Sequence, residues 1–307
     1  MPADGTLDIA IASKGRPDSV RRCLESLGAL GALVREFVVV DDGSDPPLEP
    51  IVRNGLSPDL GRRLRVIRHD VNRGLAASRN RLMRECSASF VLALDDDTEL
   101  QDAPGILRAL DAMASDPRVA IVAITQTDRH GVAWPGMQPA PVSVPSVVAS
   151  FIGYAHMVRR EVFLALGGFR EPMQIMNEEP ELSLRLLDAG YVVLYLPGTR
   201  VAHLVDPHNR DSRRYLFLSA RNNVLASLYD DPLPVLLIRV PIRLIGYFRM
   251  RRGWKIDDPG GFRVLLADLV GRLPETLRAR TPVKMSTILE WRRLVRSPRP
   301  YVAPSAQ

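Results

Sequence analysis

Short apolar runs alternate with stretches of helical periodicity over the first two thirds of the chain. The apolar runs predict strands at Leu7–Ala12, Glu36–Val40, Leu64–Arg68, Phe90–Leu94, Val119–Ile124 and Tyr191–Leu196. The helical periodicity predicts helices at Pro17–Leu30, Gly74–Cys86, Pro104–Ser115, Glu161–Leu166 and Pro180–Gly190. Strands that alternate with helices are typical of a mostly parallel sheet flanked by helices. We therefore predict an α/β fold.

The last hundred residues show only helical patterns. They predict helices at Arg213–Tyr229, Leu233–Arg252, Gly261–Arg280 and Val283–Arg296. The change of pattern divides the chain into an α/β domain, residues 1–208, and a helical C-terminal extension, residues 209–307.

The segment Leu233–Met250 is the most apolar part of the extension. Arg239 and Arg243 lie inside it, and each would cost roughly 2.5–3.5 kcal/mol at the centre of a bilayer. Pro241 also interrupts it. We therefore expect amphipathic helices that lie on a membrane surface or pack on the α/β domain, rather than a membrane span.

Polar residues follow four of the predicted strands. These exits read Ser13-Lys14-Gly15-Arg16, Asp41-Asp42-Gly43-Ser44, Asp70 with Asn72, and Asp95-Asp96-Asp97. In open α/β sheets, ligands bind in the crevice beyond the carboxyl ends of the strands. The four exits should therefore line one pocket.

The triplet Asp95-Asp96-Asp97 is the most informative of these exits. Three adjacent carboxylates repel one another unless a positive charge joins them. A hard divalent cation that holds a phosphate meets this need. In an extended chain Asp95 and Asp97 point to the same side, and Asp96 points to the other. The triplet therefore predicts a metal–diphosphate site.

Composition and charge limit the class of protein. The chain has 307 residues, 46% hydrophobic and 25% charged, as in ordinary globular proteins. The net charge is +6, with much of the basic excess in the last third, which favours an acidic partner surface. No nucleic-acid-binding signature accompanies it, so we expect a membrane surface or plain solvated helix faces, and no nucleic acid. Two cysteines without metal or redox spacing, and no secretory signal in Met1–Ser19, predict a cytoplasmic protein, which could be peripheral at the inner face of the membrane.

Five motifs occur in a characteristic order. They are Asp41-Asp42-Gly43-Ser44, Asn72-Arg73-Gly74 with Arg79-Asn80, Asp95-Asp96-Asp97, Gly167-Gly168-Phe169, and Glu178-Glu179-Pro180-Glu181-Leu182 with Arg185. Over roughly Leu7–Val224 this order resembles a family 2 glycosyltransferase of the GT-A fold. The resemblance implies a nucleotide-sugar donor, a divalent metal and inversion at the anomeric carbon.

The resemblance assigns donor binding to Arg16, Asp41, Asp42, Asn72, Gly74, Arg79, Asp95 and Asp96. Asp41 and Asp42 would accept hydrogen bonds from the base and the ribose, although an Asp-Gly turn alone could explain them. Gly74 permits close backbone approach, and the helix that it opens favours phosphate at its N-terminus. For Arg79 a structural salt bridge is an equal alternative.

For the metal, the resemblance implies Asp97 as ligand, with Asp95 facing the donor and offering a second ligand. His203 matches a further ligand of some family members, and the alternative is a structural histidine. Mg²⁺ and Mn²⁺ both suit such oxygen-rich sites. Asp96 has the least defined role of the triplet.

Glu178 and Glu179 match the acidic pair that contains the family's catalytic base. The base takes the proton of the acceptor hydroxyl during attack on the anomeric carbon. We favour Glu179; the alternative is that both glutamates only stabilise a helix N-terminus. Glu181 and Arg185 are spaced for an i,i+4 ion pair and should be structural.

Several further residues are weaker candidates. Trp134 and Tyr154 could stack on an acceptor sugar or belong to the core. Arg214 and Arg221 share a helix face and could reach a diphosphate or lie exposed.

The sequence thus predicts an inverting, metal-assisted glycosyltransferase that uses a UDP or dTDP sugar. The acceptor hydroxyl would belong to a glycan, a lipid-linked glycan or a small metabolite. One alternative is a nucleotidyltransferase acting on sugar phosphates, but the segment Ala12-Ser13-Lys14-Gly15-Arg16 is poor in glycine for that class. The other is a non-catalytic membrane-surface binding protein, which the intact acidic set disfavours.

Overall fold

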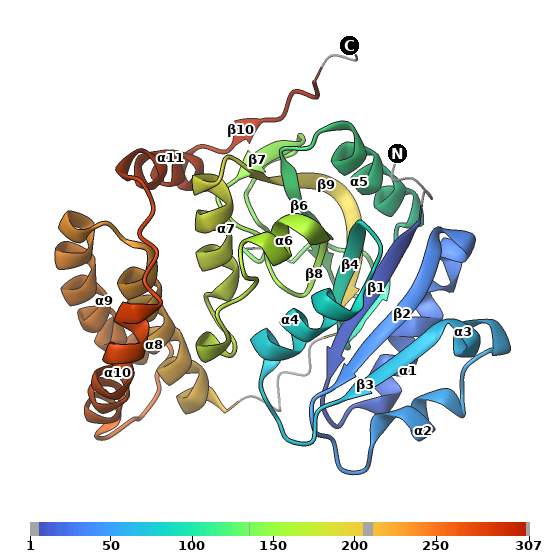
Figure 1. Cartoon of the computed structure of the whole chain (residues 1–307), viewed down its shortest axis with the longest axis horizontal. Helices are drawn as coiled ribbons and strands as arrows, with labels where there is room; N and C mark the ends of the chain where they lie inside the picture. The colour runs from blue at the N-terminus through green and yellow to red at the C-terminus, as the bar shows by residue number, and fades with distance from the viewer. Residues whose placement is uncertain (1–5, 135, 205–210, 305–307) are drawn as a thin grey trace.

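The computed structural model describes residues 6–134, 136–204 and 211–304. One ten-stranded sheet forms the centre, helices cover both of its faces, and the C-terminal helices lie to one side (Figure 1). The predicted boundary between residues 208 and 209 lies outside the described residues.

The strands are β1 (Leu7–Ser13), β2 (Val34–Asp41), β3 (Leu64–Arg68), β4 (Phe90–Asp95), β5 (Thr98–Leu100), β6 (Val119–Thr127), β7 (Ser146–Val148), β8 (Ala155–Arg159), β9 (Val192–His203) and β10 (Arg299–Pro300). The helices are α1 (Pro17–Ser26), α2 (Leu48–Arg53), α3 (Pro58–Arg63), α4 (Leu75–Glu85), α5 (Ala103–Ser115), α6 (Arg160–Ala165), α7 (Glu178–Asp188), α8 (Ser212–Asp230), α9 (Leu233–Gly253), α10 (Gly261–Arg278) and α11 (Met285–Arg296). Two short 3₁₀ segments are η1 (Leu27–Leu33) and η2 (Glu171–Met173).

The sheet is mixed, with the order β10-β7-β9-β6-β8-β4-β1-β2-β3. Parallel pairing joins β3, β2, β1 and β4, and it also joins β6 to β9. Strand β8 lies antiparallel between β4 and β6, while β7 and β10 extend the far edge in antiparallel pairing. The predicted parallel strands are therefore present, and short antiparallel strands from the second half widen the sheet.

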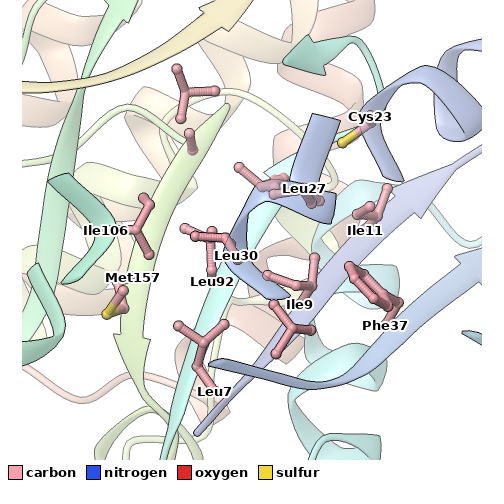
Figure 2. Close-up of a cluster of buried hydrophobic side chains, with 14 of the residues drawn as sticks. Leu7, Ile9, Ile11, Cys23, Leu27, Leu30, Phe37, Leu92, Ile106 and Met157 are labelled. Atoms are coloured by element: carbon pink, nitrogen blue, oxygen red, sulfur yellow. The ribbon is translucent and has the colours of Figure 1, made fainter. Parts of the chain in front are cut away.

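The sheet has a hydrophobic layer on each face. Figure 2 shows one layer, in which Leu7, Ile9 and Ile11 of β1 lie near Leu27 and Leu30 of η1. The intervening residue Ala10 belongs to the layer on the opposite face, under α4, α6 and α7. This alternation follows from the two-residue period of a strand that is buried on both sides.

Most predicted elements are present, but some end elsewhere. The first predicted helix stops at Ser26, and η1 follows with Gly31 at φ 54°. Strand β9 runs past Pro197 and Gly198 to His203, with a register irregularity against β6. That continuation brings His203 back to the sheet edge where the strand exits meet.

The C-terminal helices attach to the α/β domain through α8 and α11. The partly buried Arg170 pairs with Glu181 of α7 at 2.6 Å and with Asp230 of α8 at 2.9 Å. Ile288 and Trp291 of α11 pack against Leu184 of α7. Helices α9 and α10 pack on α8, on the side that faces away from the sheet (Figure 1). In the described part of the chain, none of the helices is long and apolar enough to cross a membrane.

Candidate active site

A turn at the end of β4 brings together the predicted metal ligands. Strand β4 ends at Asp95, residues 96 and 97 form the turn, and β5 then pairs antiparallel with the end of β9. This pairing sets Thr98 opposite His203. One ligand atom from each of Asp95, Asp97 and His203 lies within 4.8 Å of the others. The turn, rather than strand alternation, therefore places the two aspartates side by side.

The surroundings of His203 fit a divalent cation. Its Nε2 lies 3.2 Å from Asp97 Oδ1, and its Nδ1 lies 3.0 Å from the amide nitrogen of Gln126 on β6. Gln126 Oε1 is buried without a hydrogen-bond partner among the described residues. Because amide oxygen and nitrogen are interchangeable by rotation, Gln126 Oε1 can accept from Nδ1–H and leave the Nε2 lone pair for a metal. Two carboxylates and one imidazole form a donor set that suits Mg²⁺ or Mn²⁺.

Asp96 points away from this cluster and is fully buried. Ser13 Oγ donates to one of its oxygens at 2.5 Å, and a guanidinium nitrogen of Arg16 lies 2.5 Å from the other. Burial raises the pKa of Asp96 to about 7, against the charge of Arg16 and the hydrogen bond from Ser13. Its contacts support the turn beneath the metal ligands.

Arg16 also donates to Asp97 at 3.0 Å, from a side chain that is half exposed. Burial by itself would raise the pKa of Asp97, but His203, when its ring is protonated at both nitrogens and no metal is bound, and Arg16 together bring that pKa below its ordinary value. Asp97 is therefore held as a carboxylate, the form that binds a metal.

Asp41 and Asp42 organise the exit of β2. Asp41 accepts from the backbone N–H groups of Ser44 and Leu48 and pairs with Arg68 at 2.7 Å. Asp42 is likewise buried; it contacts His69 Nδ1 at 2.9 Å and accepts from the backbone N–H groups of residues 73 and 74. Each carboxylate already has several partners within the chain, so donor contacts by either one stay a prediction.

Asn72 and Gly74 shape the entry to α4. Asn72 Oδ1 accepts from the N–H of Gly74 at 2.9 Å, and Gly74 has φ 90°. A positive φ of this size favours glycine. The N–H of Ala76 donates to the carbonyl of Gln174 at 2.8 Å, so this part of the helix N-terminus is tied to the loop before α7.

Arg79 on α4 connects the metal ligands with the acidic pair. Its buried guanidinium donates to Asp95 at 2.9 Å and to the carbonyl of Gly153 at 2.8 Å. It also lies 3.4 Å from Glu178 and 3.6 Å from Glu179. The salt bridge that was the alternative to donor binding is therefore present, and it neutralises part of the charge on both sides of the site.

Glu178 and Glu179 form the first turn of α7. The Glu178 side chain is 1% exposed and that of Glu179 is 16% exposed. Burial raises the pKa of both, and the neighbouring Glu179 charge raises the pKa of Glu178 further. Glu179 is the carboxylate that solvent, and hence a substrate hydroxyl, can reach.

Gly153, which the sequence patterns did not single out, allows this packing. A Cβ atom there would lie 2.1 Å from Glu179 Oε1 and 2.7 Å from a nitrogen of Arg79. Only glycine leaves room for both groups.

Asn80 does not reach the acidic cluster, because its side chain bonds the N–H and C=O of Phe169 and fixes the Gly167-Gly168-Phe169 turn.

The loop before α7 is held in an unusual backbone conformation. Gln174, Met176 and Asn177 all have positive φ, which costs roughly 1–3 kcal/mol for each non-glycine residue. Asn222 of α8 lies within hydrogen-bond distance of the carbonyls of Met173, Ile175 and Met176. The C-terminal extension thus fixes the loop that presents Glu178 and Glu179.

Arg221 takes part in the same contact, since it donates to the carbonyls of Pro172 and Met173. Arg221 therefore supports the loop from within the structure. Arg214, on the same helix, lies exposed.

Glu181 and Arg185 form the expected buried ion pair at 2.6 Å.

The two aromatic candidates flank His203. Tyr154 stacks on its ring at a centroid distance of 5.2 Å, is buried, and donates its hydroxyl to the carbonyl of Ile124. Trp134 lies 6.5 Å from the same ring and is partly exposed. Tyr154 therefore belongs to the core that orients His203, while Trp134 keeps a surface for a ligand.

The fold has well-defined relatives among solved structures. The mannosyltransferase PcManGT from Pyrobaculum calidifontis in complex with GDP-Man and Mn²⁺ aligns with TM-score 0.58 and 17% identity over 96% of this chain and 88% of that one. S. aureus TarS 1-349 in complex with UDP-GlcNAc aligns with TM-score 0.62 and 16% identity over 89% and 83%. These likenesses show the GT-A fold.

Sequence comparison gives the family. The Pre-mycofactocin glycosyltransferase of Mycobacterium tuberculosis is 30% identical over 215 residues, which are 66% of this chain and 43% of the relative. The O-antigen biosynthesis protein RfbC of Myxococcus xanthus is 28% identical over 244 residues, 69% of this chain and 18% of the relative. The chain therefore spans less than half the length of these curated relatives. The model of glycosyl transferase family 2 matches residues 8–169, more than half of the chain. The chain belongs to glycosyl transferase family 2.

Proposed function

We propose that the protein is an inverting glycosyltransferase that moves a sugar from a nucleoside diphosphate sugar to an acceptor hydroxyl. The observation that carries the proposal is the arrangement at one sheet edge. There, buried Arg79 joins a candidate metal cluster to two carboxylates with raised pKa. A site for a diphosphate and a site for a base thus lie side by side.

On the donor side, Asp97, Asp95 and His203 would hold Mg²⁺ or Mn²⁺. A bound divalent ion stabilises the negative charge that develops on a leaving diphosphate. The proposed donor contacts are Arg16, Asp41, Asp42, Asn72, Gly74 and Arg79. Asp96 supports the turn beneath the metal ligands. Arg16 is exposed enough to approach a phosphate group while it contacts the aspartates.

On the acceptor side, Glu179 is the proposed base. Its carboxylate takes the proton of the acceptor hydroxyl as that oxygen bonds to the anomeric carbon. The bond from that carbon to the diphosphate oxygen breaks, and the electron pair leaves with the nucleoside diphosphate. Attack from the opposite face inverts the anomeric centre. A carboxylate with raised pKa is a stronger base, which suits this transfer. Glu178 is the alternative candidate for the base.

For the donor we propose a UDP or dTDP sugar. A TarS structure of the same fold holds UDP-GlcNAc, and the PcManGT structure holds GDP-Man, so guanosine donors belong in the test. The acceptor classes are a glycan, a lipid-linked glycan or a small metabolite.

We propose a cytoplasmic protein, peripheral at the inner face of the membrane, with a donor-binding α/β unit at residues 1–208 and a helical unit at 209–307. The unit after residue 209 contributes Asn222 to the site, so the two units act together.

A donor-hydrolysis screen tests the proposal, because water replaces the unknown acceptor. Wild type plus Mn²⁺ should release nucleoside diphosphate from one class of nucleotide sugar, and Asp97→Asn should not. Release of pyrophosphate from a nucleoside triphosphate would instead indicate a nucleotidyltransferase. Failure to bind any nucleotide sugar in the presence of Mn²⁺ would contradict the proposal altogether.

A further inference from the structure

Helix α9 carries a row of large apolar side chains on its outer face, which we name the α9 stripe. It consists of Leu233, Leu237, Ile238, Ile242, Ile245 and Phe248, with exposed fractions of 47% to 68%. Leu237 and Ile238 are adjacent, and the other spacings of three and four residues place the set along one side of the helix. The opposite side, with Val240, Leu244 and Tyr247, packs into the cluster around α8.

The two arginines inside the apolar segment do not interrupt the stripe. Arg239 turns toward α8 and pairs with Asp231 at 2.7 Å. Arg243 is largely covered and donates to the carbonyl of Asn223. The charges that argue against a membrane span in the sequence therefore face the protein, and the outer face is continuously apolar over about four helical turns.

Cations without carboxylate partners follow at the C-terminal end of the stripe. Within the described residues, Arg249, Arg252 and Lys255 form no ion pair, and all three are exposed. Trp254 beside them is 47% exposed. A cleft of about 460 Å³ opens at this end, lined by Phe248, Arg251, Arg252, Lys255, Ile256 and Asp257. Of these six residues, only Asp257 is acidic.

We propose that the α9 stripe and its cationic end dock on the surface of an anionic lipid bilayer, with the stripe at the acyl boundary and the cleft at the lipid phosphates. An apolar face with cations and a tryptophan at its border is the pattern of helices that lie in the membrane interface. A second copy of the chain fits less well, because α9 contains no acidic residue with which to pair these cations. The inference rests on the proposed peripheral location but not on the transfer reaction.

Co-sedimentation of the full chain with vesicles tests the inference. Wild type should bind vesicles that contain phosphatidylglycerol much more strongly than vesicles of phosphatidylcholine alone, with binding that weakens as salt rises. Leu237→Glu with Ile242→Glu should lower binding at least tenfold. The matched control, Leu107→Glu with Val132→Glu, adds the same charge at exposed apolar positions of the α/β domain and should bind as wild type does.

A second pair of variants tests the charges. Arg252→Gln with Lys255→Gln should weaken binding by about fivefold for each cation removed and flatten the salt dependence. Arg62→Gln with Arg129→Gln, which removes two exposed cations elsewhere, should not. Thermal unfolding checks that each variant folds.

Two results would overturn the inference. One is wild-type chain that stays in the supernatant with phosphatidylglycerol vesicles. The other is a dimer in lipid-free solution that Leu237→Glu with Ile242→Glu dissociates, since the stripe would then bind a second copy. Donor hydrolysis measured on the same preparations stands independently, so failure of docking and failure of the proposed reaction remain distinguishable.

Discussion

Asp97, in the turn after β4, and the glutamates at the start of α7 lie on either side of the Asp95–Arg79 pair, yet their surroundings shift their pKa values in opposite directions. Asp97 keeps its pKa below the ordinary value because His203 and Arg16 outweigh burial. Glu178 and Glu179 share one guanidinium, and burial raises the pKa of both. Asp97 is therefore favoured as a carboxylate, whereas the two glutamates are poised to accept a proton. In the proposed reaction, cation binding and proton transfer would thus fall to separate carboxylates.

Replacing Glu179 tests this separation most strongly. Glu179→Gln should lower turnover by about 10²–10⁴-fold, because a general base is lost, while donor affinity in the presence of Mn²⁺ stays the same. Transfer kinetics and donor titration by calorimetry measure the two effects. Asp97→Asn should instead lose Mn²⁺ and donor binding together. Unchanged turnover of the Glu179 variant would remove it as the base, and a larger loss in Glu178→Gln would transfer the role.

Replacing Gln126 tests the cation side without changing a proposed metal ligand. Gln126→Leu should weaken Mn²⁺ binding by about 10–100-fold, because His203 loses the partner that fixes its ring and tautomer. Electron paramagnetic resonance of free Mn²⁺ reads the affinity directly. Gln138→Leu is the matched control. The Gln138 side chain hydrogen-bonds the backbone N–H and C=O of Gln126 and, in the described part of the chain, makes no hydrogen bond to His203. Equal Mn²⁺ affinity in the Gln126 variant and wild type would show that the ring needs no such partner.

The pH dependence tests the proton side. A base must be ionised, and burial raises the pKa of Glu179, so turnover should fall as pH drops through that raised value, by about tenfold per pH unit. With saturating Mn²⁺ and donor, the acid limb should lie above the ordinary glutamate value of about 4.3. The midpoint of this acid limb reports an apparent pKa of the coupled Glu178–Glu179 pair rather than the pKa of one residue. A limb at the ordinary value would mean that the base lies in a solvated environment.

Asn222 tests how the acidic pair is positioned, with the smallest expected effect. Asn222→Ala removes the hydrogen bonds to the loop at Met173–Met176 and should destabilise the fold by about 1–3 kcal/mol, since buried carbonyls lose their partner. Turnover should fall several-fold while Mn²⁺ affinity holds. Asn223→Ala is the control, because the Asn223 side chain hydrogen-bonds the Ser219 carbonyl of its own helix. An equal loss in both variants would point to a general effect on α8.

The sequence predicted the sheet edge and its acidic residues because local patterns encode them. Apolar runs that stop at Asp41 or Asp95 place carboxylates at strand ends wherever those strands are buried. Strand alternation was the predicted reason for Asp95 and Asp97 to point to one side, whereas in the structure a turn at residues 96 and 97 brings them together. The place of His203 came only from resemblance to a family, because the antiparallel pairing of β5 with β9 joins segments far apart in the chain.

Other parts of the site depend on contacts that no local pattern records. Gly153 is needed because Arg79 and Glu179 both pass close to it, although neither is its neighbour in sequence. Gln126 lies near the end of β6, beyond the predicted apolar run Val119–Ile124, and nothing local marks it as a partner of His203. Ser13 was within a predicted polar exit, but its bond to Asp96 depends on how β1 and β4 pair.

The hydrogen bonds from Asn222 of α8 to the loop before α7 also have a consequence for protein engineering. The family match ends at residue 169, yet the backbone that carries Glu178 and Glu179 is clamped by Asn222. A chimaera that exchanges everything after residue 169 would keep the matched segment but lose the native contacts between Asn222 and the loop before Glu178 and Glu179. A workable crossover has to keep the loop, α7 and α8 together as one inherited block, so the smallest transplantable unit is set by this clamp and not by the limits of sequence similarity.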